Sequence, residues 1–144
     1  MKENKMKYKF MDHTADAQFQ AYGRSLEEAF QNAAEATSNL MWETEKIKPR
    51  KKKIINIDGK DKKQMLVNFL EEILFLFESE DFLVNSVKDL VIQKDQSAYH
   101  LKATFIGDHV SDKYEIFGSI KAVTYNDMVI ESNDRYMIQV VVDI

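Results

Sequence analysis

The chain has 144 residues, a hydrophobic fraction of 44% and a formal net charge of −4, which is typical of one soluble globular domain. It contains no cysteine, which excludes disulfides, cysteine-ligated zinc, iron–sulfur clusters and a thiol nucleophile. The acidic balance does not favour a protein that wraps nucleic acid, and no apolar run is long enough to span a bilayer, so we expect a cytoplasmic protein without membrane contact.

The first part of the sequence predicts two short strands and a helix. Residues 1–6 are expected to be a frayed terminus, and strands are expected at 7–10 and at 18–22, where apolar and polar residues alternate. Ser25 followed by Glu28 forms a capping box, in which each side chain satisfies a free backbone amide at a helix start. Apolar residues at three- and four-residue spacing extend this helix to about Trp42.

The rest of the sequence predicts one more helix and most of the strands. A strand at 54–57 precedes a broadly apolar helix that begins at a second capping pair, Asp61 and Gln64, and ends at 79–81. Further strands are predicted at 84–92, at 99–105, at 114–125 with a bend at Gly118, at 128–130 and at 136–143. We therefore expect an α+β fold in a single compact domain over 1–144, with two helices packed on one face of a largely antiparallel sheet.

An acidic segment near the N-terminus is the first candidate site. Asp12, His13 and Asp16 lie within five positions, and carboxylates this close repel unless a cation, a proton or hydrogen bonds compensate. Carboxylate oxygens are the ligands that calcium and magnesium prefer. A turn is the alternative interpretation, because Asp and Thr side chains often bond to their own backbone. The spacing by itself leaves both interpretations open.

The C-terminal strand supplies the second candidate. Asp143 and the α-carboxylate of Ile144 follow an apolar run, so a docked terminus would hold two anions side by side, whereas an exposed strand end would leave them in water. Lys121, Val123 and Tyr125 share one face of a predicted strand. Lys121 can extend to solvent or pair with Asp16 or Asp143.

The sequence lacks the motifs of common enzyme classes. Neither Gly59 nor Gly107 lies in a nucleotide-binding pattern, and no serine has the surroundings of a nucleophile. His100 is predicted on a strand surface and His109 in a loop. The basic run at 50–53 is typical of a solvated face, because no aromatic residue is interleaved with it as in proteins that bind single strands. We therefore expect a non-catalytic protein without strong direct nucleic-acid binding.

Several separated motifs resemble those of the archease family. FMDHTAD at 10–16 is similar to the family's N-terminal signature, and segments between 21 and 34 are similar to its first helix and the approach to it. LEEILFLF at 70–77 resembles its second helix, while KAVTY at 121–125 and VDI at 142–144 resemble its C-terminal blocks. The resemblance runs from about Phe10 to the last residue, with the motifs in the family's order.

This resemblance implies an accessory protein of RtcB-type RNA ligases. Such ligases join a 2′,3′-cyclic phosphate or 3′-phosphate end to a 5′-hydroxyl end in tRNA splicing, with GTP and manganese, through a guanylylated histidine. Archeases promote that guanylylation and multiple turnover, and they bind a divalent metal ion, calcium or magnesium, at a site of their own. Some members are also linked to modulation of a tRNA methyltransferase.

The resemblance also assigns roles to individual residues by matching motif. Asp16 and Asp143 correspond to metal ligands, the α-carboxylate of Ile144 to a further ligand, and Asp12 to a ligand or to a group that supports one.

A second set of residues is expected to serve activation of the partner ligase: Lys121, His13 and Tyr125. Many archeases have a histidine after the tyrosine of the KAVTY block, whereas this chain has Asn126, which cannot titrate near neutral pH.

Two other functions stay open at this point. Clustered carboxylates also serve two-metal chemistry, so a small metal-dependent phosphoester hydrolase is one alternative. The other is a chaperone or methyltransferase modulator in which a metal ion only fixes the C-terminus. Hydrolysis of model phosphoesters that Asp16→Ala abolishes would favour the hydrolase. Lost thermal stability on chelation, with unchanged ligase activation, would favour the chaperone.

Overall fold

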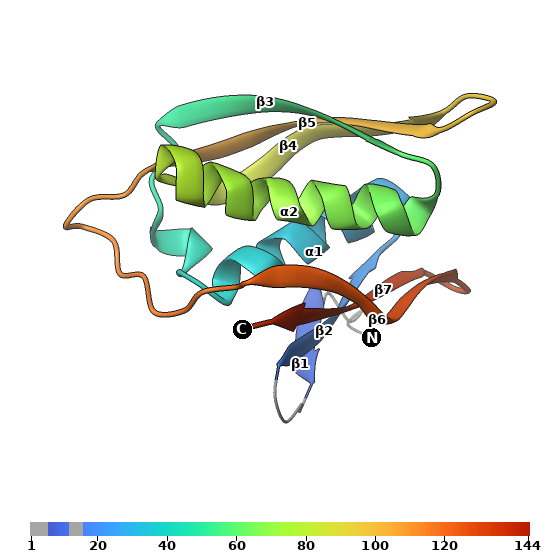
Figure 1. Ribbon diagram of the computed structural model, residues 1–144, viewed down its shortest axis with the longest axis horizontal. Helices are drawn as coiled ribbons and strands as arrows, with labels where there is room; N and C mark the ends of the chain where they lie inside the picture. Colours follow the sequence, from blue (N-terminus) through green and yellow to red (C-terminus); the bar gives the residue numbers. More distant parts are fainter. Residues whose placement is uncertain (1–5, 12–15) are drawn as a thin grey trace, which may run out of the picture.

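The fold has two antiparallel sheets with two helices between them (Figure 1). The computed structural model describes residues 6–11 and 16–144. One sheet has the strand order β1-β2-β7-β6 and the other has the order β3-β5-β4. The elements in chain order are β1 (Tyr8–Met11), β2 (Ala17–Gly23), α1 (Leu26–Asn39), the 3-10 helix η1 (Thr44–Lys46), β3 (Lys51–Gly59), α2 (Lys62–Glu80), β4 (Phe82–Lys94), β5 (Tyr99–His109), β6 (Ala122–Ser132) and β7 (Tyr136–Asp143).

Both helices begin at the capping pairs that the sequence predicts. The hydroxyl oxygen of Ser25 accepts a hydrogen bond from the Glu28 amide at 3.1 Å, and the Glu28 carboxylate accepts one from the Arg24 amide at 2.6 Å. Asp61 accepts from the Gln64 amide at 2.8 Å in the same way. These contacts satisfy amides that have no acceptor within the helix, which is why the starts are encoded locally.

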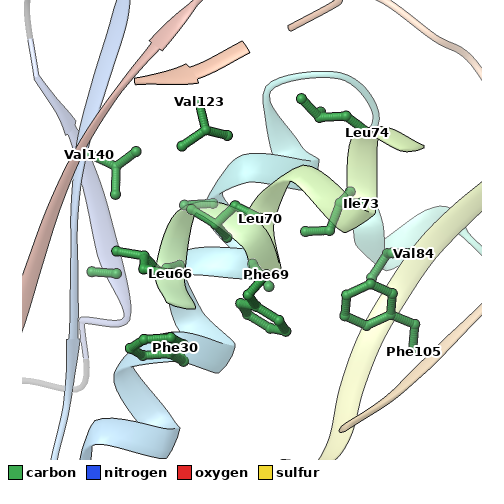
Figure 2. Close-up of a cluster of buried hydrophobic side chains, with 14 of the residues drawn as sticks. Phe30, Leu66, Phe69, Leu70, Ile73, Leu74, Val84, Phe105, Val123 and Val140 are labelled. Atoms are coloured by element: carbon green, nitrogen blue, oxygen red, sulfur yellow. The ribbon is translucent and has the colours of Figure 1, made fainter. Parts of the chain in front are cut away.

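The core forms around α2, which is buried on two sides (Figure 2). Its apolar face is broader than one sheet requires, and it contacts both sheets. Figure 2 shows Val123 and Val140 of the four-stranded sheet on one side of the helix and Phe105 of the three-stranded sheet on the other. The fully buried α2 residues in this cluster are Met65, Leu66, Phe69, Leu70 and Ile73. The helix therefore joins the two sheets into one hydrophobic core.

The predicted α+β class and antiparallel pairing are confirmed. The arrangement differs in one respect, since the strands form two sheets that enclose the helices instead of one sheet that carries them on a single face. Neither helix in the described part of the chain combines the length and the apolar character needed to cross a membrane. Most of the terminus predicted to fray, residues 1–5, lies outside the described residues.

The segment before β6 is not a strand, so the prediction of a strand from 114 was wrong for 114–121. Gly118 passes so close to the end of α1 that a Cβ atom there would lie 2.3 Å from the carbonyl oxygen of Leu40. The neighbouring amide of Phe117 donates to the carbonyl oxygen of Met41 at 2.9 Å. The Phe117 amide is therefore bonded to the turn after α1 and is not available to pair with a neighbouring strand. β6 begins at Ala122 and includes the short strand predicted at 128–130.

Candidate metal and partner site

Three neighbouring strands bring residues from both ends of the chain to one edge of the four-stranded sheet. Ala17 of β2 pairs with Val142 of β7, and Ala122 of β6 pairs with Asp143 of β7. Asp16 immediately precedes Ala17, so it continues β2 on the side where Asp143 continues β7. The strand register therefore places the two predicted carboxylates next to each other in the sheet.

Strand alternation directs these carboxylates away from the helices. Phe19 of β2 and Val142 of β7 are fully buried on the helix side of the sheet. Because side chains alternate along a strand, Asp143, which follows Val142, points to the other side. Asp16 does the same, because it precedes Ala17, the partner of Val142. Asp143 is exposed, whereas Asp16 is half-buried and its Oδ1 atom is buried. A carboxylate oxygen shielded from water interacts more strongly with a nearby cation, because the local dielectric constant is low. This edge thus offers oxygen ligands of the kind that hard divalent cations prefer.

The backbone of Lys121 is attached to the same edge. Its amide donates a hydrogen bond to the carbonyl oxygen of Asp143 at 2.7 Å. Two residues later, the amide of Val123 donates to the Oε2 atom of Glu71 on α2 at 3.2 Å. These two contacts fix the start of β6 to β7 on one side and to α2 on the other. The Lys121 side chain is exposed, but it extends from a backbone that these hydrogen bonds hold in place.

Tyr125 lies on a bulge that the sequence did not reveal. The pairing of β6 with β7 shifts between Thr124 and Val129. Thr124 donates its hydroxyl hydrogen to the carbonyl oxygen of Val141 at 2.8 Å and accepts from the Asn126 amide at 3.3 Å. Tyr125 is 54% exposed while Val123 is 6% exposed, so the two residues that were predicted to share one face occupy different environments. The bulge presents Tyr125 and Asn126 to solvent.

The remaining predicted site residues are Asp12 and His13, which lie outside the described residues. Ile144 follows β7 and is 52% exposed. Over 6–11 and 16–144, no three Asp, Glu, His or Cys side chains are placed to hold a metal ion together. The described residues thus contribute two side-chain carboxylates and the main chain of Ile144 at this edge. Their oxygen-only chemistry fits calcium or magnesium better than zinc or copper.

A separate cluster surrounds His100 on β5. Its Nδ1 atom lies 2.6 Å from Oδ1 of Asp58, and its Nε2 atom lies 2.7 Å from Oδ2 of Asp95. The hydrogen bonds to Asp58 and then to Asp95 raise the pKa of His100 above its ordinary value. His100 is an exposed strand residue as predicted, but its two carboxylate partners come from β3 and from the β4–β5 turn. Sequence spacing gives no signal for such a cross-strand contact.

Comparisons with known proteins find related sequences and a similar solved structure. Residues 8–144 match the model described as the archease protein family (MTH1598/TM1083). The chain is 41% identical over 140 residues to the protein archease of Pyrobaculum islandicum and 38% identical over 139 residues to that of Methanosarcina barkeri, with 95% of each chain covered in both cases. The solution structure of Methanobacterium thermoautotrophicum protein 1598 is similar with a TM-score of 0.81 at 28% identity, covering 96% of this chain and 99% of that one.

Proposed function

Because this chain belongs to the archease family, we propose that it is a non-catalytic accessory protein that activates an RtcB-type RNA ligase. In this proposal the protein also binds a divalent cation, calcium or magnesium, at the edge formed by the ends of β2 and β7. The observation that carries the proposal is the register that aligns Asp16 with Asp143 beside the backbone of Lys121.

The cation would be held by Asp16, Asp143 and the α-carboxylate of Ile144, with Asp12 as a further oxygen donor. When bound, it supplies positive charge that can hold these carboxylates together and attract anionic groups of a partner. Asp16 is half-buried, and a cation at this edge would interact more strongly with a carboxylate that is partly shielded from water.

Lys121 and Tyr125 would make the contacts that the ligase recognises. Both side chains are exposed; the amide of Lys121 is hydrogen-bonded to β7, and Tyr125 follows Thr124, whose hydroxyl is hydrogen-bonded to β7. A fixed backbone lowers the entropic cost of presenting these groups to a partner. Activation requires that the contacts bind the guanylylation-competent ligase more tightly than its other states, since only a difference in affinity shifts an equilibrium.

The test is RNA ligation by a cognate RtcB-type ligase under multiple-turnover conditions, with GTP and manganese and substoichiometric amounts of this protein. We expect turnover to rise with the parent protein and to stay at the basal rate with Asp16→Ala or Asp143→Ala. Glu131→Ala is the matched control, because it removes an exposed carboxylate from β6 away from the edge. Unchanged activation by Asp16→Ala and Asp143→Ala would refute the role of this site. Phosphoester hydrolysis by the protein alone would favour the hydrolase instead.

A further inference from the structure

The basic residues of the chain are concentrated around β3. Residues 46–63 contain nine Lys or Arg and two Asp, a net charge of +7, although the whole chain has a net charge of −4. The remainder of the protein is therefore strongly acidic. Three of the nine basic residues are in ion pairs: Lys46 with Glu43, Arg50 with Asp108 and Lys53 with Glu80. Of the three lysines in β3, Lys52 alternates to the side of the strand opposite Ile55.

β3 belongs to a sheet with one uncovered face. In the order β3-β5-β4, both helices lie on the same side of the sheet (Figure 1). Ile55 of β3 and Phe105 of β5 point to that side and are buried at 5% and 0% exposure. Their neighbours Ile54 and Lys52 alternate to the other face, where Ile54 is 67% exposed. No helix or strand among residues 6–11 and 16–144 covers this outer face.

Lysines from all three strands meet on this outer face. Lys52 of β3 pairs with Ile106, Lys102 of β5 lies between Asn56 and Val91, and Lys88 of β4 pairs with Thr104. Sheet spacing puts the Cα atoms of Lys88 and Lys102 roughly 8 Å apart and those of Lys52 and Lys102 roughly 14 Å apart. Thr104 lies among the three lysines, paired with Lys88 on one side and with the exposed Ile54 on the other, and Asn56 is paired with Lys102.

The three lysines are in no direct ion pair with a neighbouring carboxylate. Among the ion pairs of the described residues, none involves Lys52, Lys88 or Lys102. The same face also carries carboxylates, which have other partners: Asp58 and Asp95 both contact His100, at 2.6 and 2.7 Å. Asp108 lies 4.0 Å from Arg50 and accepts a hydrogen bond from Tyr114. Asp89 is exposed beside Lys88.

Edge protection is the simpler explanation for a lysine-rich β3, because charged side chains on an edge strand prevent pairing with other chains. It accounts for Lys51 and Lys52 but not for Lys102, which lies on the central strand β5. Unpaired lysines on all three strands of one face, with the Thr104 hydroxyl among them, can contact successive phosphates of one strand.

We propose that the outer face of the β3-β5-β4 sheet binds the phosphate backbone of RNA without reading its sequence. The face has no exposed aromatic stacking platform among the residues named above, so the contacts are to phosphate and sugar. The choice of RNA over an acidic protein segment rests on the proposed function, because an activator of an RNA ligase meets RNA at its partner. The site lies on a different sheet from the Asp16 and Asp143 edge.

The test is fluorescence anisotropy of a labelled single-stranded RNA titrated with this protein alone at several salt concentrations. We expect a Kd of roughly 1 to 100 µM that weakens by about 20-fold between 50 and 200 mM salt, as counterion release predicts for about three phosphate contacts on a single strand. The triple variant Lys52→Gln, Lys88→Gln, Lys102→Gln should lose at least about tenfold in affinity at low salt and most of the salt dependence. The triple arginine variant at the same positions should bind like the parent.

The matched control replaces three exposed lysines outside this face, Lys9→Gln, Lys62→Gln and Lys113→Gln, with the same loss of charge. Equal weakening by both glutamine variants, or binding of a polyglutamate peptide but not of RNA, would overturn the proposal. Asp143→Ala should bind RNA like the parent. The anisotropy experiment contains no ligase. Loss of RNA binding would therefore overturn this proposal without bearing on ligase activation. Absence of ligase activation would refute the proposed function without changing the measured RNA affinity.

Discussion

The backbone amide of Lys121 donates a hydrogen bond of 2.7 Å to the carbonyl oxygen of Asp143. This contact joins two residues of the proposed site through main-chain atoms, so it does not depend on either side chain. Substitutions of these side chains therefore test chemistry at the edge while the strands that form it stay paired.

Calcium should stabilise the protein against heat. A ligand that binds only the folded state at about 100 times its Kd adds roughly 2.7 kcal/mol to the free energy of unfolding, which corresponds to a rise in Tm of roughly 5 to 10 °C for a chain of this size. We expect this rise in differential scanning fluorimetry with calcium and its reversal by a chelator. Asp143→Asn should remove most of the shift, because a neutral amide replaces a charged ligand.

Glu131→Gln is the control for that experiment, since it removes an exposed negative charge elsewhere on β6. An equal calcium shift in the parent and in Asp143→Asn would place the cation at another site. Adding one glycine after Ile144 moves the terminal carboxylate and should reduce the shift if that carboxylate is a ligand.

Lys121→Gln should separate partner activation from metal binding. The variant keeps the amide that bonds to Asp143, so its unfolding free energy and its calcium shift should match those of the parent. Ligase turnover should fall to the basal rate, because the ammonium group is lost. Lys113→Gln removes an exposed lysine of the 110–121 segment and should activate normally. A parallel loss of calcium binding in Lys121→Gln would show that the lysine acts through the metal site.

Gly118→Ala should destabilise the protein, although a change from glycine to alanine usually stabilises a chain by about 0.4 to 1 kcal/mol through the unfolded state. The added Cβ would lie 2.3 Å from the carbonyl oxygen of Leu40, a backbone atom that cannot move aside alone. We expect a loss of about 1 to 3 kcal/mol in urea unfolding. Ser119→Ala is the neighbouring control. A neutral or stabilising effect of Gly118→Ala would mean that the segment does not pack on the end of α1.

His100 should make the stability of the three-stranded sheet depend on pH. Its hydrogen bonds to Asp58 and Asp95 raise its pKa in the folded protein. The stabilisation is therefore fully present below the ordinary histidine value and is lost as the pH rises through the raised pKa. NMR titration should place the pKa of His100 above its ordinary value, and Asp58→Asn should lower it. In His100→Asn, this part of the pH dependence of unfolding should disappear. A His100 pKa that does not respond to Asp58→Asn would contradict the contact.

Local features of the fold were predictable from the sequence. The capping pairs that begin with Ser25 and Asp61 are short-range hydrogen bonds, and both appear as expected. The strand predicted at 136–143 has the predicted bounds, because its apolar run Val140–Val142 continues almost to the last residue. The strand expected from 114 failed where Gly118 packs against Leu40, a contact between segments far apart in the chain.

The sequence by itself determined the archease motifs, the starts of the two helices and the apolar faces of the strands. Each of these features depends on residues only a few positions apart. Only the tertiary structure decided that Asp16 lies beside Asp143, that a bulge exposes Tyr125 and that Lys52, Lys88 and Lys102 share one uncovered face. These relationships depend on strand register and on the burial of α2 between two sheets. Register and burial are chosen by the packing of the whole chain, so no local pattern in the sequence specifies them.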